Sequence, residues 1–123
     1  MSNKIYVASS LDNAKRISEI VQILKDAGYE ITYDWTTHGR VENQEQLQQI
    51  AKGEYDGVKD CDVFIMVHPA RFGSHFEFGA AYALGKRIMI LEESEIEELK
   101  SFYFLSGIER FKSIQDILNN INK

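Results

Sequence analysis

One segment in the middle of the chain combines a carboxylate with glycines and a serine in a pattern that can do chemistry. Residues 73–79 read GSHFEFG, and they open a stretch with helical spacing that runs to Gly85. A helix that begins at Ser74 would turn its free N–H groups and its dipole toward an anionic ligand group. The same groups would keep the Glu77 carboxylate ionised at neutral pH. Such a carboxylate is suited to covalent attack on an electrophilic carbon, for example the anomeric carbon of a sugar.

Two other interpretations fit the same residues. The spacing Ser74-x-x-Glu77 is also a capping box, in which both side chains only satisfy backbone donors at a helix start. Tyr6, inside an apolar run, is either a core aromatic or an active-site hydroxyl. The residue types alone leave these alternatives open.

Alternating strands and helices must position these residues. Apolar runs and alternation predict strands over residues 4–8, 29–35, 63–67 and 88–91, with a fifth over 102–105. Apolar spacing of three and four predicts helices over residues 12–27, 45–61, 74–85 and 113–121. Asp12 is the expected N-cap of the first helix, and Gly28 is its stop.

This alternation with short connections is typical of right-handed βαβ units. We therefore predict one domain over residues 1–123 of the α/β class. Its fold would be a flavodoxin-like, doubly wound parallel sheet of four to five strands in a three-layer sandwich. Ligands of such sheets bind at the carboxyl ends of the strands, where the strand order reverses. Residues 6–12 and 68–77 should face each other there.

Composition and charge limit the classes of ligand that this chain could bind and indicate where it is located. The formal net charge of −5 argues against polymeric nucleic acid, which needs a basic surface. Cys61 is the one cysteine, and the histidines lack the spacing of metal ligands, so no metal site is expected. The longest apolar run, residues 63–67, is far too short to cross a membrane, and the first ten residues lack a signal-peptide core. These features predict a cytoplasmic protein.

Three segments together resemble the nucleoside 2-deoxyribosyltransferase family, which also contains deoxynucleoside-monophosphate N-glycosidases. They are residues 5–10 (IYVASS), residues 54–63 (EYDGVKDCDV) and residues 73–88 (GSHFEFGAAYALGKRI). The resemblance extends over about residues 4–91, and the third segment is its most specific part. It implies that Glu77 is the nucleophile and Tyr6 an active-site tyrosine.

The chain departs from the family pattern at the acid–base position. The family places an aspartate about three residues before the glycine that corresponds to Gly57, and this chain has Glu54 there. Glutamate can do the same acid–base work with a different reach. Asp56 is a second candidate, and the sequence does not choose between the two.

A second departure concerns the substrate. Six residues before the nucleophile, the transferases carry an acidic residue and the nucleotide hydrolases a serine, whereas this chain has Arg71. An arginine there would pair well with a 5′-phosphate. Asp12, in the first loop, would instead repel a phosphate, and Arg71 could also be a solvated loop cation.

The resemblance implies a double-displacement mechanism. The base would stack near Trp35 or Phe72, and the sugar would lie against Ser9 and Ser10, with Gly73 and Ser74 as further donors. Glu77 would attack the anomeric carbon while Glu54 or Asp56 protonates the leaving base. Water or a second base would then complete hydrolysis or transfer without a metal or organic cofactor. A homo-oligomer is implied as well.

Other functions of this fold are less compatible with the sequence. A receiver domain needs an aspartate at the end of the third strand, which here ends Met66-Val67-His68. A flavin-binding module needs a glycine-rich loop after the first strand, and residues 9–13 contain no glycine. The remaining alternative is a non-catalytic nucleotide or nucleotide-sugar binding domain, because function resides in sites rather than folds.

Overall fold

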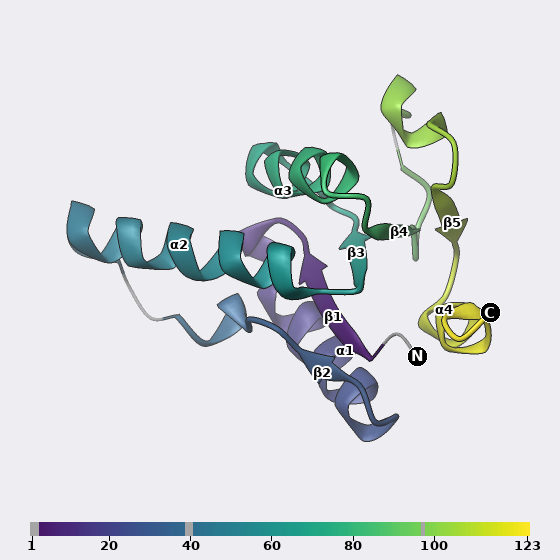
Figure 1. Ribbon diagram of the computed structural model, residues 1–123, viewed down its shortest axis with the longest axis horizontal. Helices are drawn as coiled ribbons and strands as arrows, with labels where there is room; N and C mark the ends of the chain where they lie inside the picture. Colours follow the sequence, from purple (N-terminus) through teal and green to yellow (C-terminus); the bar gives the residue numbers. More distant parts are fainter. Residues whose placement is uncertain (1–2, 39–40, 97) are drawn as a thin grey trace.

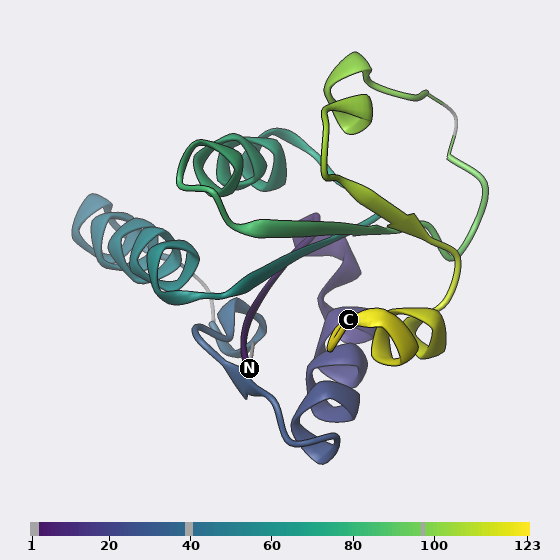
Figure 2. The same ribbon diagram turned by 45° about the vertical axis from the view of Figure 1, so that its right-hand side comes forward.

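The computed structural model describes residues 3–38, 41–96 and 98–123 and has three layers (Figures 1 and 2). The central layer is a five-stranded, all-parallel sheet in the order β2-β1-β3-β4-β5. Its strands are β1 (Lys4–Ala8), β2 (Glu30–Ile31), β3 (Val63–Val67), β4 (Arg87–Leu91) and β5 (Glu109–Phe111). This is the flavodoxin-like order, so the predicted fold class is confirmed.

In the part of the chain that the structure describes, four α-helices cover the sheet. They are α1 (Ala14–Asp26), α2 (Gln44–Asp60), α3 (Phe72–Ala83) and α4 (Ile114–Asn120). Helices α2 and α3 lie side by side on one face, and α1 and α4 lie on the other, as the two views show (Figures 1 and 2). Among the described residues, no helix is long and apolar enough to span a membrane.

The hydrophobic pattern explains the position of β3 at the centre. All five of its residues are buried, because helices cover both of its faces and strands flank both of its edges. In the register with β1, Tyr6 lies opposite Phe64, and the two rings stack with centroids 5.8 Å apart. The strand order reverses between β1 and β3, which places the ligand-binding edge of the sheet above the ends of these two strands.

Two predicted strands are wrong in extent or place. Residues 102–105 form no strand: Ser101–Phe104 is a 3₁₀-helix that buries Tyr103 and exposes Phe104, and the fifth strand is Glu109–Phe111. Only Glu30 and Ile31 of the predicted strand 29–35 pair with β1. The alternation arises because Tyr29, Ile31 and Tyr33 pack against the core, which does not require a ladder of hydrogen bonds.

Two helix starts also differ from the predictions. A 3₁₀-helix, Leu11–Asn13, precedes α1, so Asp12 does not cap that helix, although Gly28 ends it with a φ of 97° as expected. Helix α3 begins at Phe72 rather than Ser74, with Arg71 as its N-cap. The Ser74 hydroxyl accepts a hydrogen bond from the Arg71 N–H at 2.8 Å.

A carboxylate is buried at the end of β4. Glu92 is 1% exposed, and its two oxygens accept hydrogen bonds from Arg110 at 2.7 and 3.0 Å and from Lys112 at 3.3 Å. These bonds hold the pKa of Glu92 below its ordinary value, because Arg110 above all stabilises the charged form. The cluster fastens the end of β4 to β5.

We expect Glu92→Gln to lower the free energy of unfolding at pH 7 by about 1.5–3 kcal/mol, the usual worth of a hydrogen bond to a charged group. The depressed pKa means that this contribution is present at neutral pH and is lost as the pH falls below the ordinary value of 4.5. Urea unfolding at pH 7 and pH 4 should therefore show the difference between variant and wild type narrowing in acid. Glu98→Gln, an exposed carboxylate in a surface pair with Lys100, is the control.

Candidate active site

A cavity of about 830 Å³ opens at the predicted edge of the sheet. The loops after β1 and β3, the first turns of α3 and one face of α2 surround it. Most of its wall is apolar. The apolar lining residues are Leu11, Ala14, Trp35, Val41, Leu47, Ile50, Ala51, Tyr55, Val58, Phe72, Phe76 and Ala80. Two carboxyl groups, Glu54 and Glu77, lie in this largely apolar surface.

The loops after β1 and β3 are tied together at one proline. The Pro69 carbonyl accepts hydrogen bonds from the Ser10 N–H at 2.9 Å and from the Ser9 hydroxyl at 3.0 Å. Asn13 Nδ2 donates in turn to Ser9 Oγ at 3.1 Å. Ser9 and Ser10 both line the cavity, so these bonds fix that part of its wall.

Glu77 lines the cavity from α3, and Tyr6 lies behind it. The Tyr6 hydroxyl donates a hydrogen bond to Glu77 Oε2 at 2.8 Å. Tyr6 is 0% exposed: its ring is part of the core, and its hydroxyl contacts the carboxylate. Tyr6 does not line the cavity itself and reaches it only through its hydrogen bond to Glu77.

The predicted ionisation of Glu77 is wrong in its cause and extent. Because α3 begins at Phe72, Glu77 is in the second helical turn, away from the free N–H groups, and it forms no capping box with Ser74. The pKa of Glu77 is raised to about 7, by burial above all and also by the nearby Glu54, while the Tyr6 hydrogen bond lowers it. A pKa raised this far by burial beside a cavity is typical of functional sites.

Tyr6→Phe should therefore change the pH profile of any reaction that needs anionic Glu77. Loss of the hydroxyl removes the one hydrogen bond that lowers the Glu77 pKa, so the acid limb of kcat/KM should move to higher pH. A hydrogen bond to a charged group contributes about 1.5 kcal/mol or more, which corresponds to about one pKa unit. We therefore expect kcat/KM to fall about tenfold at pH 6 and less at pH 8.5. Tyr29→Phe, whose hydroxyl contacts Asn122 instead, is the control.

The structure brings Glu54 to the cavity and leaves Asp56 outside it. Two residues apart on α2, the side chains point to different sides of the helix. Glu54 lines the cavity, and burial raises its pKa while the charge of His38 lowers it. Asp56 forms an ion pair with Lys52 at 2.6 Å on the outer face. Of the two acid–base candidates, only Glu54 is in a position to meet a ligand.

Arg71 and Asp12, which suggested opposite substrates, contact each other. Arg71 Nη2 lies 3.3 Å from Asp12 Oδ2, and Arg71 Nε donates to Ser10 Oγ at 3.1 Å. The Ser10 hydroxyl donates to Asp12 Oδ1, and this bond more than any other holds the Asp12 pKa below its ordinary value. The cation at the cavity mouth is thus already paired, although both side chains are well exposed.

The other predicted binding residues all line the cavity but differ in exposure. Trp35 is buried, and its Nε1 donates to the Val7 carbonyl at 2.7 Å, so its ring is a fixed part of the wall. Phe72 is 96% exposed at the rim. Gly73 and Ser74 lie in the first turn of α3, where Ser74 also donates to the Arg71 carbonyl at 3.0 Å.

The sequence analysis missed Tyr33 and His38. His38 lines the cavity, and its Nε2 is hydrogen-bonded to the Tyr33 hydroxyl at 2.5 Å. The signal was present in α2, where Gly53 and Gly57 are four residues apart and so share one helix face. A Cβ at Gly53 would lie 2.5 Å from the Tyr33 ring, so these glycines leave room for a large side chain.

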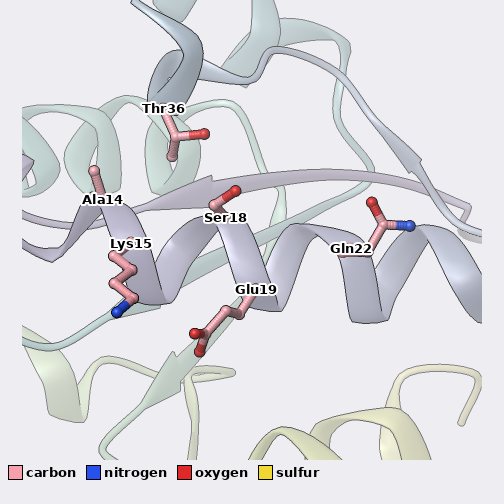
Figure 3. Close-up of a pocket in the computed structure, with 6 residues that line it drawn as sticks. All are labelled: Ala14, Lys15, Ser18, Glu19, Gln22 and Thr36. Carbon is pink, nitrogen blue, oxygen red and sulfur yellow. The ribbon is translucent and has the colours of Figure 1, made fainter.

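A second, shallower hollow of about 540 Å³ runs along α1 (Figure 3). Thr36 lies above α1 in Figure 3, and the side chains of Lys15 and Glu19, which also line the hollow, leave the helix on the side away from Thr36. Its one carboxylate, Glu19, pairs with Arg16 at 3.0 Å. This hollow has no pair of carboxyl groups, so the cavity at Glu77 is the candidate active site.

The fold and the cavity define a flavodoxin-like α/β protein with two carboxyl groups in the wall of a cavity at the point where the strand order reverses. A family model described as nucleoside 2-deoxyribosyltransferase matches residues 5–106. The chain therefore belongs to the nucleoside 2-deoxyribosyltransferase family, as the sequence motifs indicated. No curated protein matches the chain.

Solved structures share the fold. A 2-deoxyribosyltransferase from Bacillus psychrosaccharolyticus is 22% identical with a TM-score of 0.76, and the match covers 94% of this chain and 90% of that one. The Clostridium botulinum CMP N-glycosidase BcmB is 24% identical with a TM-score of 0.63, covering 98% and 99%. A 2-deoxyribosyltransferase from Leishmania mexicana is 19% identical with a TM-score of 0.65, covering 95% of each chain.

Proposed function

We propose that this protein cleaves the N-glycosidic bond of a 2′-deoxynucleoside or its 5′-monophosphate, with Glu77 as the nucleophile. The observation that carries the proposal is the half-buried Glu77 carboxyl in an open cavity, held by the Tyr6 hydroxyl at 2.8 Å. Family membership supports the same activity. The solved neighbours include a 2-deoxyribosyltransferase and a CMP N-glycosidase, so both acceptors, a second base and water, enter the proposal.

The proposed reaction has two steps, with a glycosyl ester of Glu77 between them. In the first, an oxygen of anionic Glu77 bonds to the anomeric carbon, the bond to the base nitrogen breaks, and the base takes a proton from Glu54. In the second, water or another base attacks the glycosyl ester and gives its proton to Glu54, and Glu77 leaves as a carboxylate. No cofactor is needed for either step.

The test is release of base from a panel of deoxynucleosides and their monophosphates, with and without a free acceptor base, followed by chromatography. Free base or an exchanged nucleoside from the wild-type protein, absent with Glu77→Ala, supports the proposal. Ligand binding without turnover would favour the alternative, a non-catalytic nucleotide or nucleotide-sugar binding domain, and would refute catalysis.

The Arg71–Asp12 pair makes the choice between nucleoside and monophosphate measurable. An exposed ion pair contributes at most about 1 kcal/mol, so a phosphate can displace Asp12 from Arg71 at a small cost in free energy. We expect monophosphates to be accepted, and Asp12→Asn to lower their KM several-fold because it frees the cation and removes a negative charge. Arg71→Ala should raise the KM for monophosphates about tenfold and leave that for nucleosides within twofold. Equal effects on both substrates would contradict a phosphate-binding role.

We propose, finally, that a second copy of the chain covers the rim of the cavity. Phe72 and Phe76 are 96% and 71% exposed there, next to the exposed Leu11. Such apolar patches mark interaction sites on soluble proteins. Light scattering should show a homo-oligomer that Phe72→Asp and Phe76→Asp weaken, and a monomeric wild-type protein would refute this part.

A further inference from the structure

Three hydrogen bonds converge on the backbone carbonyl of Arg71, the N-cap residue of α3. The carbonyl oxygen accepts from the His75 N–H at 3.0 Å, from the Ser74 hydroxyl at 3.0 Å and from His75 Nδ1 at 2.7 Å. The first of these is the ordinary bond of a helical turn, and the other two come from side chains. Ser74 and His75 thus fix the backbone from which the Arg71 side chain leaves.

The ring of His75 joins this carbonyl to Tyr103. Because a carbonyl oxygen only accepts, Nδ1 carries a proton, and in the neutral ring Nε2 is then an acceptor. The Tyr103 hydroxyl lies 2.8 Å from Nε2 and donates to it. Burial above all raises the pKa of Tyr103 to about 12, so this hydroxyl keeps its proton at neutral pH. Hydrogen bonds therefore connect Tyr103 through His75 to Arg71.

Tyr103 is itself held firmly by its surroundings. It is 1% exposed and belongs to the 3₁₀-helix Ser101–Phe104, between β4 and β5. Its ring stacks on that of His75 with centroids 5.9 Å apart, and it meets the ring of His68, which directly follows β3, in a T-shaped contact at 5.4 Å. A buried aromatic side chain with few rotamers gives its hydroxyl a fixed position. The segment between β4 and β5 thus supports the start of α3.

The guanidinium of Arg71 is held much less firmly than its backbone. The side chain is 69% exposed, and it contacts Ser10 Oγ at 3.1 Å and Asp12 Oδ2 at 3.3 Å. A phosphate that displaces Asp12 leaves this side chain oriented by Ser10 and by the backbone at its base. Ordering a long side chain on a ligand costs conformational entropy, and the cost is smaller when part of that chain is already fixed.

We propose that His75 and Tyr103 are positioning residues that hold Arg71 where it meets the 5′-phosphate of the substrate. The inference rests on the proposed function, with Arg71 as the phosphate ligand, and adds to it the residues that set the preference for monophosphates over nucleosides. Neither His75 nor Tyr103 lines the cavity, so each acts on the ligand through Arg71. Their loss should weaken phosphate binding and leave the reaction at Glu77 unchanged.

The kinetic test compares the KM for a deoxynucleoside monophosphate with the KM for the corresponding deoxynucleoside. Tyr103→Phe removes only the hydroxyl, and it should raise the KM for the monophosphate about threefold, with the nucleoside KM and both kcat values within about twofold of the wild type. Tyr82→Phe, an exposed tyrosine of α3 outside the cavity, is the control. An unchanged KM for the monophosphate, or equal changes for both substrates, would mean a merely structural role and would overturn the proposal.

Two substitutions of His75 separate its two side-chain hydrogen bonds. Asparagine carries a nitrogen near the place of Nδ1, so His75→Asn can still donate to the Arg71 carbonyl but does not reach Tyr103. His75→Leu loses both bonds. We expect the KM for the monophosphate to rise about threefold in His75→Asn and about eightfold in His75→Leu. Equal losses in the two variants would contradict the role of the bond to the Arg71 carbonyl.

A double-mutant cycle tests whether the effect passes through Arg71. In an Arg71→Ala background no guanidinium is left to position, so adding His75→Leu should change the KM for the monophosphate by less than about twofold. A further loss of about eightfold in that background would show that His75 acts independently of Arg71, and it would overturn the proposal.

Binding of the sugar without its base tests the same claim without turnover. In titration calorimetry, 2-deoxyribose 5-phosphate should bind the wild-type protein more tightly than 2-deoxyribose, and Tyr103→Phe should reduce this advantage about threefold. Equal binding of the two sugars, or an advantage that Tyr103→Phe leaves unchanged, would overturn the inference even in an active enzyme. Conversely, an advantage that Tyr103→Phe reduces, in a protein that releases no base, would refute the proposed function and leave the role of His75 and Tyr103 in phosphate binding intact.

Discussion

Glu77→Gln should reduce base release from every accepted deoxynucleoside by at least about 10³-fold while the protein stays folded. The amide nearly matches the carboxylate in shape but cannot form the glycosyl ester, and loss of a nucleophile has effects of this order or larger. The loss should appear in kcat, since Glu77 contributes more to reaction than to binding. Initial rates with saturating substrate measure it.

We expect the Glu77→Gln variant to keep its fold, because an amide oxygen at position 77 can still accept the Tyr6 hydrogen bond. Thermal unfolding should therefore change little, or show stabilisation, since a neutral side chain replaces a half-buried acid. The matched control is Glu19→Gln, a carboxylate of the hollow on α1. A Glu77→Gln variant with more than a tenth of wild-type kcat would exclude Glu77 as the nucleophile.

Glu54→Gln should cause the second largest loss, about 10²- to 10³-fold in kcat for bases that must be protonated, as removal of a general acid does. Asp56→Asn, on the outer face of α2 in its pair with Lys52, should stay within twofold of the wild type. The comparison uses the same steady-state assay for both variants at pH 7.

The leaving group gives this prediction a second readout. A deoxynucleoside with an alkylated base should be cleaved by Glu54→Gln nearly as fast as by the wild type in the first step, because no proton is needed. Equal losses for both kinds of base would contradict the acid role of Glu54. Near-normal rates for Glu54→Gln and a large loss for Asp56→Asn would assign the role to Asp56 instead.

The fold was predictable from sequence wherever burial alone decides the structure. The unbroken apolar run Val63–Val67 favours a strand covered on both faces, and it is the central strand. The segment after Gly28 and the run Phe102–Leu105 were misread, since aromatic side chains pack on a core from turns as well as from strands. An apolar pattern predicts which side chains are buried, but it does not predict which backbone segments pair as strands.

The place of Glu77 in the candidate site was predictable, and its electrostatics was not. The spacing and the family resemblance pointed to Glu77 and Tyr6, which the structure places in contact. The start of α3 was misplaced because Arg71 is not a typical N-cap residue, and with it the ionisation of Glu77 was misjudged. The contact of Arg71 with Asp12 joins loops 59 residues apart, which no local pattern could reveal.

Mass spectrometry of the protein quenched during turnover tests the central claim most directly. Digestion should yield a deoxyribosyl ester, or its 5′-phosphate, on the peptide that contains Glu77, and the adduct should be absent from Glu77→Gln. An analogue with fluorine at the 2′ position, which slows breakdown of the ester, should make the adduct accumulate. Turnover without any adduct on Glu77, or an adduct on a different residue, would contradict the account.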